Sequence, residues 1–347
     1  AKTALANGIS TSEQLKAMVD QARDTQSLAD YSYLKQIEPA IEHLFPKLGD
    51  EKEKVMVFGD SDVDGQTATA ILVKMMRSVR YRLLVNKFGP EKAQEIVIQT
   101  IDSHIPDRRA EGYGLNREAL KQIKKDGFNT VITVDCGIRD RDLVKFAKQL
   151  GLNLIVTDHH VPDPESVPQD AVAVINPKLD VAPEHKAYYL PGAGVAYKLA
   201  RALANKAGID IKDSFIEMAG IAAIADLAGM IGENRTFARA ALIRLTTPGR
   251  NKGIAAILKA LKAENVDEET IAFMVAPLLN AAGRLGRTET AMNLLMARTS
   301  EDADKAVREL FPLLAEIRQI VQRIMIDAEK QLVDFDPAKE DGIVVAG

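Results

Sequence analysis

The sequence predicts an α/β protein in which a parallel sheet is flanked by helices and is followed by an all-helical region and a long connecting helix. Three short apolar runs, each followed at once by acidic residues, indicate strands that alternate with helices: Val55 to Phe58, Thr130 to Val134 and Leu152 to Val156. Such alternation predicts a parallel sheet with helices on both faces. From Gly192 onward the periodicity is almost wholly helical.

The elements follow one another in a clear order. Residues 11 to 45 carry apolar positions at helical spacing, which predicts a helical N-terminal segment. After the first strand we expect a helix from Gln66 to about Arg80, and we expect the segment from Tyr81 to Ser103 to form a helical insertion at the rim of a cleft. The remaining helical segments are predicted at 194–207, 213–226, 235–247, 251–263, 286–297 and 301–334. The last is long enough to connect two lobes.

The 347 residues exceed what one ordinary core accommodates, so we expect more than one structural unit. The predicted units are a helical N-terminal segment (1–50), an α/β domain (51–235), a helical part of the same core (236–299), a long connecting helix (300–335) and the start of a C-terminal domain (336–347). The sequence ends on an apolar, strand-like run from Ile343 to Gly347 that has nothing after it to pair with. We therefore expect the chain to be a fragment of a longer protein.

Composition excludes several classes of protein. Hydrophobic residues make up 46% of the chain and charged residues 27%, which is typical of a folded protein. We expect a cytoplasmic protein, because no apolar run approaches the length of a membrane span and no signal peptide pattern is present. The single cysteine, Cys136, can form neither an internal disulfide nor a thiolate metal site by itself. The net charge of -4 argues against a broadly basic surface for nucleic acid, so any such ligand must be held locally.

The first chemically distinctive segment follows the first strand. Asp60, Asp62 and Asp64 alternate in a loop that ends at Gly65, and alternating carboxylates can hold a hard divalent cation. A solvated turn is the alternative interpretation. An EF-hand calcium loop is excluded, because the glutamate that it requires would fall at Ile71.

Further polar groups follow the other two strands, and parallel strands direct their carboxyl ends to one edge of the sheet. His159 and His160, beside Asp158, supply imidazoles that suit manganese, zinc or iron. Asp135 is a second candidate ligand, and its alternative role is to cap a helix that begins near Arg139. Asp226 lies in an apolar run of small residues, where a charge needs a partner or a metal.

These motifs together resemble the DHH phosphoesterases, and among them the RecJ-type exonucleases. The resemblance covers roughly residues 8 to 335, and its motifs occur in the order of that family. They are Gly59 to Gly65, Ile105 to Arg108 with Gly112 to Leu115, Val134 to Gly137, Asp158 to His160, Ala225 with Asp226, and Asn280 to Arg284. Two positions depart from the usual pattern: Ser61 replaces an aromatic residue, and Leu278 replaces a frequent arginine.

The resemblance implies a role for each matching residue. It implies that two Mn²⁺ or Mg²⁺ ions are bound, with Asp135 as the bridging and catalytic ligand and Asp60 in or near the ligand shell. The other implied ligands are Asp62, Asp64, His159 and Asp226. His160 would contact the scissile phosphate or assist proton transfer, and Arg284 would act with it in catalysis. The implied substrate contacts are Arg108, Gly112, Tyr113, Asn280, His160 and Arg284.

Two of these segments keep an alternative interpretation. Arg108 is expected to face a phosphate, and a salt bridge is its other possible role. The turn at Gly192, Ala193 and Gly194 can bind an anion through backbone N–H groups, or its glycines can serve close helix packing. Residue types alone leave both questions open.

The function implied by the resemblance is exonucleolytic hydrolysis of single-stranded DNA from 5′ to 3′, with release of 5′-mononucleotides through two-metal activation of water. A phosphodiesterase for oligoribonucleotides, cyclic dinucleotides or adenosine bisphosphate is the first alternative, and a non-catalytic replication scaffold is the second. We expect a monomer, and a single-strand binding protein or a helicase is a candidate partner. RecJ-type proteins continue past the long helix into a further substrate-binding domain, and we expect this chain to end where that domain begins.

Overall fold

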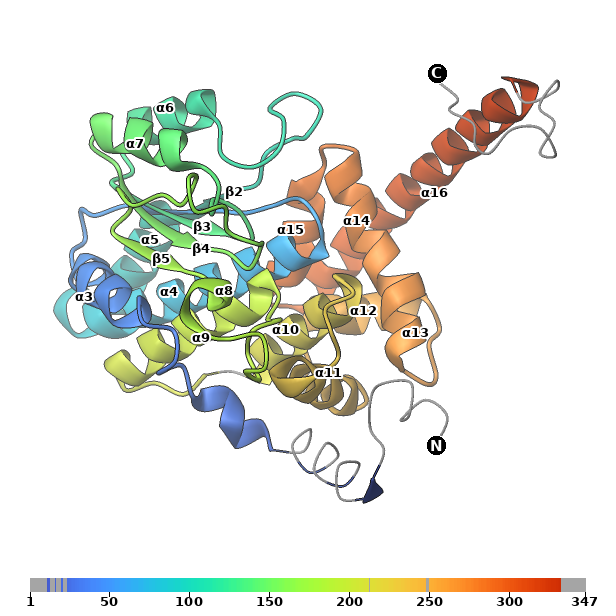
Figure 1. Cartoon of the computed structure of the whole chain (residues 1–347), viewed down its shortest axis with the longest axis horizontal. Helices are drawn as coiled ribbons and strands as arrows, with labels where there is room; N and C mark the ends of the chain where they lie inside the picture. Colours follow the sequence, from blue (N-terminus) through green and yellow to red (C-terminus); the bar gives the residue numbers. More distant parts are fainter. Residues whose placement is uncertain are drawn as a thin grey trace.

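The computed structural model describes residues 11, 12, 16, 20, 24–211, 213–247 and 250–331. The expected start of a C-terminal domain at 336–347 and most of the predicted N-terminal helical segment lie outside these residues. The described part is an α/β domain with a large helical region beside it, from which one long helix projects (Figure 1).

A five-stranded parallel sheet forms the centre of the α/β domain. The strands are β1 (Val55–Phe58), β2 (Ile101–His104), β3 (Thr130–Val134), β4 (Asn153–Thr157) and β5 (Ala173–Ile175). They lie in the order β2-β1-β3-β4-β5, and every neighbouring pair is parallel. The chain thus reverses direction across the sheet between β1 and β3. In doubly wound folds, the crevice beyond the carboxyl ends of these two strands is the usual ligand site.

Alternate residues of the strands belong to two different cores. Val57 of β1 and Ile132 of β3 point into a large core shared with the helical region. Phe58 and Val131 of the same strands point into a smaller core on the other face. Both faces of the sheet are therefore covered, as the alternation of strands and helices predicted.

The helices account for most of the chain. They are the 3-10 helix η1 (Thr25–Ala29), α3 (Ile37–Leu48), α4 (Val63–Phe88), α5 (Pro90–Thr100), α6 (Arg117–Lys125), α7 (Arg141–Gln149), α8 (Pro177–Asp180), α9 (Gly192–Ala207), α10 (Asp213–Ala225), α11 (Gly232–Leu245), α12 (Lys252–Ala260), α13 (Glu268–Thr270), the π-helix η2 (Ile271–Val275), α14 (Ala276–Arg284), α15 (Thr288–Met296) and α16 (Ser300–Gln331).

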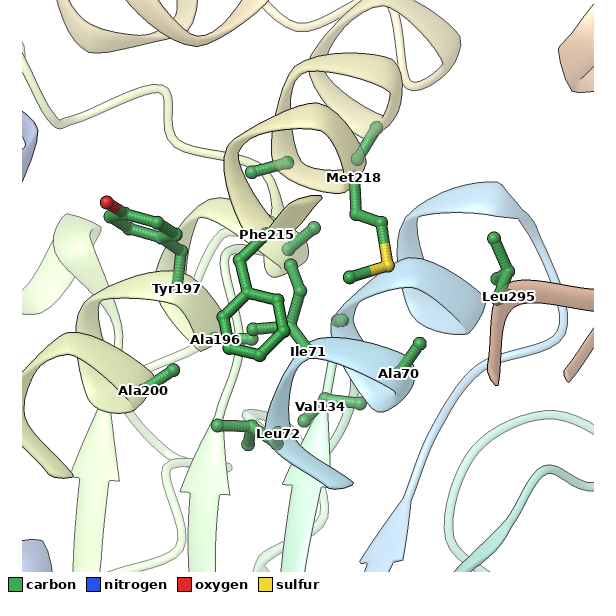
Figure 2. Close-up of a cluster of buried hydrophobic side chains, with 14 of the residues drawn as sticks. Ala70, Ile71, Leu72, Val134, Ala196, Tyr197, Ala200, Phe215, Met218 and Leu295 are labelled. Atoms are coloured by element: carbon green, nitrogen blue, oxygen red, sulfur yellow. The ribbon is translucent and has the colours of Figure 1, made fainter. Parts of the chain in front are cut away.

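The large core lies where α4, α9 and α10 meet the sheet. Ile71 of α4, Ala196 of α9 and Phe215 of α10 are almost completely buried and lie close together, near Val134 of β3 (Figure 2). Small residues such as Ala196 allow α9 to approach α4 closely. This packing fixes the N-termini of α4 and α9, both of which contribute to the site described below.

The predicted fold class is confirmed, and several element predictions need correction. The sheet has two further strands, β2 and β5. The segment from Tyr81 to Ser103 is not a rim insertion formed of helix alone, because α4 continues to Phe88, α5 follows, and Ile101 begins the edge strand β2. Asp135 does not cap a helix, since α7 begins at Arg141 with Asp140 at its N-cap. Asn280 to Arg284 lie on a helix, α14, that the periodicity did not indicate.

The long connecting helix is present as α16. Its first turns pack on the core through Ala303, Ala306 and Leu310, whereas Ile324 and Met325 farther along are exposed. Figure 1 shows its second half extending away from the body of the protein. Its last three predicted residues, 332–334, are outside the described range. No helix within the described residues is long and apolar enough to span a membrane.

Candidate metal centre

Three aspartates follow β1 at the start of α4. Asp62 is the N-cap of this helix, and its carboxylate accepts a hydrogen bond from the backbone N–H of Gly65 at 3.0 Å. Gly65 is required there, because a Cβ would lie 2.5 to 2.7 Å from the backbone of Asp60. The loop therefore turns tightly enough to bring all three carboxylates to the carboxyl end of the strand.

Asp60 is completely buried and carries its own counter-charge. The Nη2 atom of Arg108 lies 3.1 and 3.2 Å from the two carboxylate oxygens of Asp60. The guanidinium also stacks over the ring of Tyr113, 4.3 Å from its centroid. The arrangement in the structure is thus the salt bridge, and the phosphate contact that the sequence suggested for Arg108 stays a prediction.

Asp64 is held by the beginning of α9. The backbone N–H groups of Gly192 and Ala193 donate to its two oxygens at 2.6 and 2.7 Å. A helix N-terminus favours negative charge, so this contact both orients and stabilises the carboxylate. The turn that begins at Gly192 therefore does bind an anion, and that anion is the carboxylate of Asp64. The turn is also tightly packed, since a Cβ at Gly192 would lie 2.7 Å from Asp135.

Asp135 follows β3 with a left-handed backbone, at a φ of 60°. This conformation is uncommon for a residue other than glycine and is often associated with functional positions. Its Oδ1 lies 3.0 Å from Nε2 of His159, which is also 3.6 Å from Asp64 and 4.0 Å from Asp226. The four side chains come from the ends of β3 and β4, the start of α4 and the end of α10, and they converge on one point.

The donor atoms of this cluster fit a metal ion. Asp135 Oδ1 and His159 Nε2 are buried and have no hydrogen-bond partner among the described residues, although they lie only 3.0 Å apart. Ligand atoms within 4.8 Å of one another form three overlapping groups. These groups are Asp60 with Asp62 and Asp135, Asp64 with His159 and Asp226, and Asp135 with His159 and His160. Oxygen and imidazole donors suit Mn²⁺, and oxygen donors suit Mg²⁺.

The electrostatics of the cluster also favour a bound cation. Burial, and after it the charges of neighbouring carboxylates, raise the pKa of Asp64 and of Asp135 well above the ordinary value. Burial raises the pKa of Asp226 to about 6, with a further contribution from Asp62. Burial lowers the pKa of His159 to about 3, so its imidazole is neutral and able to ligate. Several carboxylates in one buried place repel one another, and a divalent ion would relieve that repulsion.

His160 is oriented by Asp158. The His160 Nδ1 and Asp158 Oδ1 atoms are 2.8 Å apart, and the backbone N–H groups of Ile138, His159 and His160 also donate to the Asp158 carboxylate. Asp158 is buried, whereas His160 is exposed, so the second ring nitrogen of His160 is available to a ligand. This positioning role of Asp158 was not predicted from the sequence, although its place beside the two histidines was a signal.

The motif from Asn280 to Arg284 on α14 supports the acidic loop, which is the segment from Asp60 to Asp64. Asn280 accepts a hydrogen bond from the backbone N–H of Val63 at 3.0 Å. A Cβ at Gly283 would lie 1.9 Å from the backbone oxygen of Ser61, so the helix and the loop are in direct contact. Arg284 is exposed beside this contact and makes no hydrogen bond or ion pair with the part of the chain that the structure describes. Asn280 therefore holds the start of α4, its predicted contact with substrate stays a prediction, and Arg284 is exposed to solvent.

The Gly112 and Tyr113 region lies next to the cluster. Tyr113 is 60% exposed, and Gly112 has a φ of 84° and so much open space that a Cβ there would meet nothing within 4 Å. Tyr113 also lines a cavity of about 210 Å³ with Asp135, Asp158 and His160. The structure thus brings the candidate metal ligands together, and it places Arg108 and Asn280 in contact with the loop that carries Asp60 to Asp64.

Comparisons with known proteins agree with this geometry. Residues 54–225 match the family model described as DHH family, N-terminal domain. The single-stranded-DNA-specific exonuclease RecJ of Bacillus subtilis is 36% identical over 85% of this chain, and that of Escherichia coli is 29% identical over 91%. The chain spans only 34% and 54% of the lengths of these two relatives.

A solved structure extends the match to three dimensions. The crystal structure of exonuclease RecJ bound to manganese superposes with a TM-score of 0.72 at 30% identity, covering 88% of this chain and 71% of that one. The shared core therefore includes the sheet and much of the helical region. The chain belongs to the DHH family and, within it, to the RecJ group.

Proposed function

We propose that this chain is the catalytic part of a metal-dependent exonuclease that hydrolyses single-stranded DNA. The proposal rests on one structural observation above all, the convergence of carboxylates and a neutral imidazole. Two of their buried atoms, Asp135 Oδ1 and His159 Nε2, have no hydrogen-bond partner in the described part of the chain. It is supported by the relatives, which are named as single-stranded-DNA-specific exonucleases. The units proposed along the chain remain those given from the sequence, with residues 51–299 as the catalytic core.

Two Mn²⁺ or Mg²⁺ ions are the proposed cofactors, as in related RecJ structures solved with these metals. Asp135 is proposed to bind both ions, and Asp60 to lie at the edge of the ligand shell because of its salt bridge to Arg108. The other proposed ligands are Asp62, Asp64, His159 and Asp226. When bound, such ions acidify a water molecule and neutralise charge on a phosphodiester.

The remaining residues are proposed to position the substrate. His160, fixed through Nδ1 by Asp158, presents its other nitrogen to the scissile phosphate or to a proton in transfer. Arg284 is exposed and free to make bidentate contacts with a phosphate. Tyr113 is a candidate stacking surface for a base, because the residue is 60% exposed. Asn280 is proposed to act indirectly, through the acidic loop that it holds.

We further propose that cleavage proceeds from 5′ to 3′, releases 5′-mononucleotides and is carried out by a monomer in the cytoplasm. A single-strand binding protein or a helicase is the proposed type of protein partner. Membership in the RecJ group supports the proposed polarity and type of partner, whereas the monomer and the cytoplasmic location are the expectations stated from the sequence.

The decisive experiment is Mn²⁺-dependent digestion of single-stranded DNA and RNA labelled at the 5′ or the 3′ end. We expect mononucleotides from the 5′ end of DNA, and we expect Asp135→Ala to abolish their release. Asp142→Ala is the matched control, because Asp142 is an exposed aspartate in the first turn of α7. Activity restricted to dinucleotides or RNA would favour the small-substrate branch of the family. If no metal-dependent cleavage of any substrate is detected, the non-catalytic replication scaffold is the remaining alternative.

A further inference from the structure

A second cavity, of about 620 Å³, lies away from the metal centre. Its walls are the second half of α4, the helix α5, the loop before α12 and the loop after α15. None of the clustered carboxylates or histidines lines it. Lys74 and Arg77 of its wall lie roughly 15 to 20 Å along α4 from Asp64, given the rise of an α-helix. The volume is in the range of small-molecule sites.

The wall of this cavity is positively charged. Among the described residues that line it, the basic side chains are Lys74, Arg77, Arg250, Lys252 and Arg298, and none is a carboxylate. The whole chain has a net charge of -4, so this concentration of cations is a local feature. The buried carboxylate of Glu217 lies behind the wall, where it accepts a hydrogen bond from the backbone N–H of Asn251 at 2.7 Å.

Several of these cations keep donors for a ligand. Arg77 donates from Nε and Nη2 to the carbonyl of Ile101, which fixes its guanidinium and leaves Nη1 unused. Arg298 and Lys252 are exposed and make no hydrogen bond or ion pair with any described residue. Burial lowers the pKa of Arg77, Asp102 raises it, and the positive charge of Arg298 lowers it again. Arg77 and Arg298 thus line the same cavity and repel each other, and a bound anion would relieve that repulsion.

The rest of the wall is suited to a ligand with both polar and apolar parts. The amide Nε2 of Gln94 is buried and has no hydrogen-bond partner within the described ranges, so the wall contains an unused donor. Tyr81, Val97 and Met296 add an apolar surface. Asn251 fixes the adjacent loop by capping α12 and by donating to the carbonyl of Leu295 at 3.3 Å. The cavity is therefore largely formed before a ligand arrives.

We propose that this cavity is a second binding site, for a small phosphorylated ligand of the nucleotide class. Its phosphates would contact Arg77, Lys252 and Arg298, and its heterocycle would lie against Tyr81 and Met296. A phosphate accepts charge-assisted hydrogen bonds from several cations at once. A phosphorylated ligand therefore suits this lining better than a neutral ligand does. The site is independent of the proposed nuclease activity.

The test is calorimetric titration of the chain in EDTA with adenosine diphosphate, pyrophosphate and adenosine. Binding is expected for adenosine diphosphate, weaker binding for pyrophosphate and none for adenosine. The double variant Lys252→Gln/Arg298→Gln should bind adenosine diphosphate at least about tenfold more weakly. Neither side chain has a polar contact with the described residues, so the variant should fold, and its melting temperature checks this. Lys305→Gln/Arg318→Gln on α16 is the control with the same change of charge.

Four outcomes would overturn the proposal. The first is no binding of adenosine diphosphate, and the second is equal binding by the Lys252→Gln/Arg298→Gln variant. Loss of binding in Asp135→Ala would place the nucleotide at the metal centre instead. Displacement by oligothymidylate that depends on Lys252 and Arg298 would make the cavity part of a nucleic-acid path rather than a small-molecule site. Nuclease activity is not read in any of these experiments, so failure here leaves the proposed function untouched.

Discussion

Replacing Gly192 with alanine should damage the metal centre more than the fold. Gly192 is the first residue of α9, and its N–H donates to Asp64 at 2.6 Å. A Cβ at this position would lie 2.7 Å from the Cβ of Asp135 and 2.9 Å from its Oδ1. Carbon atoms in ordinary contact are about 3.5 Å apart or more, so one group must move by roughly 0.8 Å. The group that moves is Asp135 or the end of α9 that orients Asp64.

The size of the effect follows from how precisely such a site must be built. A productive site tolerates displacements of about 0.5 Å, and a misplacement of about 1 Å can reduce the rate about 100-fold. We therefore expect Gly192→Ala to lower Mn²⁺-dependent kcat/KM by about 100-fold and to weaken Mn²⁺ binding. Overpacking of this kind should lower the free energy of unfolding by only about 1 to 3 kcal/mol.

The assay combines calorimetric Mn²⁺ titration, cleavage of labelled single-stranded DNA, and urea unfolding in EDTA. Gly229→Ala is the matched control, because Gly229 follows Asp226 closely, yet a Cβ there would meet nothing nearer than 3.8 Å. The control should behave as the unmodified chain does. Unchanged metal affinity together with unchanged cleavage in Gly192→Ala would refute the reasoning, because the steric contact would then be absorbed without displacing any ligand.

Three further predictions address other parts of the molecule. Asp158→Asn should lower activity about 10- to 100-fold, measured as kcat, because the amide holds the ring of His160 less firmly. Lys198→Met should lower the free energy of unfolding by about 3 to 5 kcal/mol in urea titrations. The Nζ atom of Lys198 lies 2.7 Å from the carboxylate of Glu233, and methionine would leave this buried carboxylate without that cation. For Asp140→Asn, we compare the free energy of unfolding of the variant with that of the unmodified chain. The difference, in favour of the variant, should be about 1 to 2 kcal/mol larger at pH 8 than at pH 4.

The sign of the Asp140 prediction follows from its environment. Burial, and then the charge of Asp158, raise the pKa of Asp140 to about 6. The folded state therefore keeps a proton that the unfolded state has lost between about pH 4 and pH 6. In the unmodified chain, Asp140 therefore contributes stability at low pH, and this contribution is lost as the pH rises through 6. The full difference of pKa corresponds to about 3 kcal/mol, and partial exposure of the carboxylate reduces it.

Each of these three predictions has a contrary outcome. For Asp158→Asn, an equal loss in the exposed control Asp163→Asn would point to a general charge effect. For Lys198→Met, the double variant with Glu233→Gln should recover part of the lost stability, and no recovery would contradict the ion-pair argument. For Asp140→Asn, a difference in stability that does not change between pH 4 and pH 8 would show that Asp140 does not titrate in this range.

The sequence alone predicted the parts of the fold in which local pattern and final structure agree. β1 is wholly apolar, and β3 and β4 each contain three apolar residues, so these three strands could be recognised from the sequence. β2 and β5 were missed because β2, with the sequence Ile-Asp-Ser-His, is polar and lies at an edge, and β5 has only three residues. Strands are predicted from their apolar pattern, and strands at the edge of a sheet need that pattern least. The sequence signal is therefore weakest for edge strands.

By itself, the sequence determined the family, the chemistry of the donor groups and the edge of the sheet at which they would meet, because strand ends and carboxylates are local features. The tertiary structure decided which partner each group takes. It paired Arg108 with Asp60, directed the N-terminus of α9 at Asp64, and placed α14 against the acidic loop. These contacts join residues that are 48 to 217 positions apart. Hydrogen bonds and close packing between such distant segments form only after the helices have docked, so no local pattern encodes them.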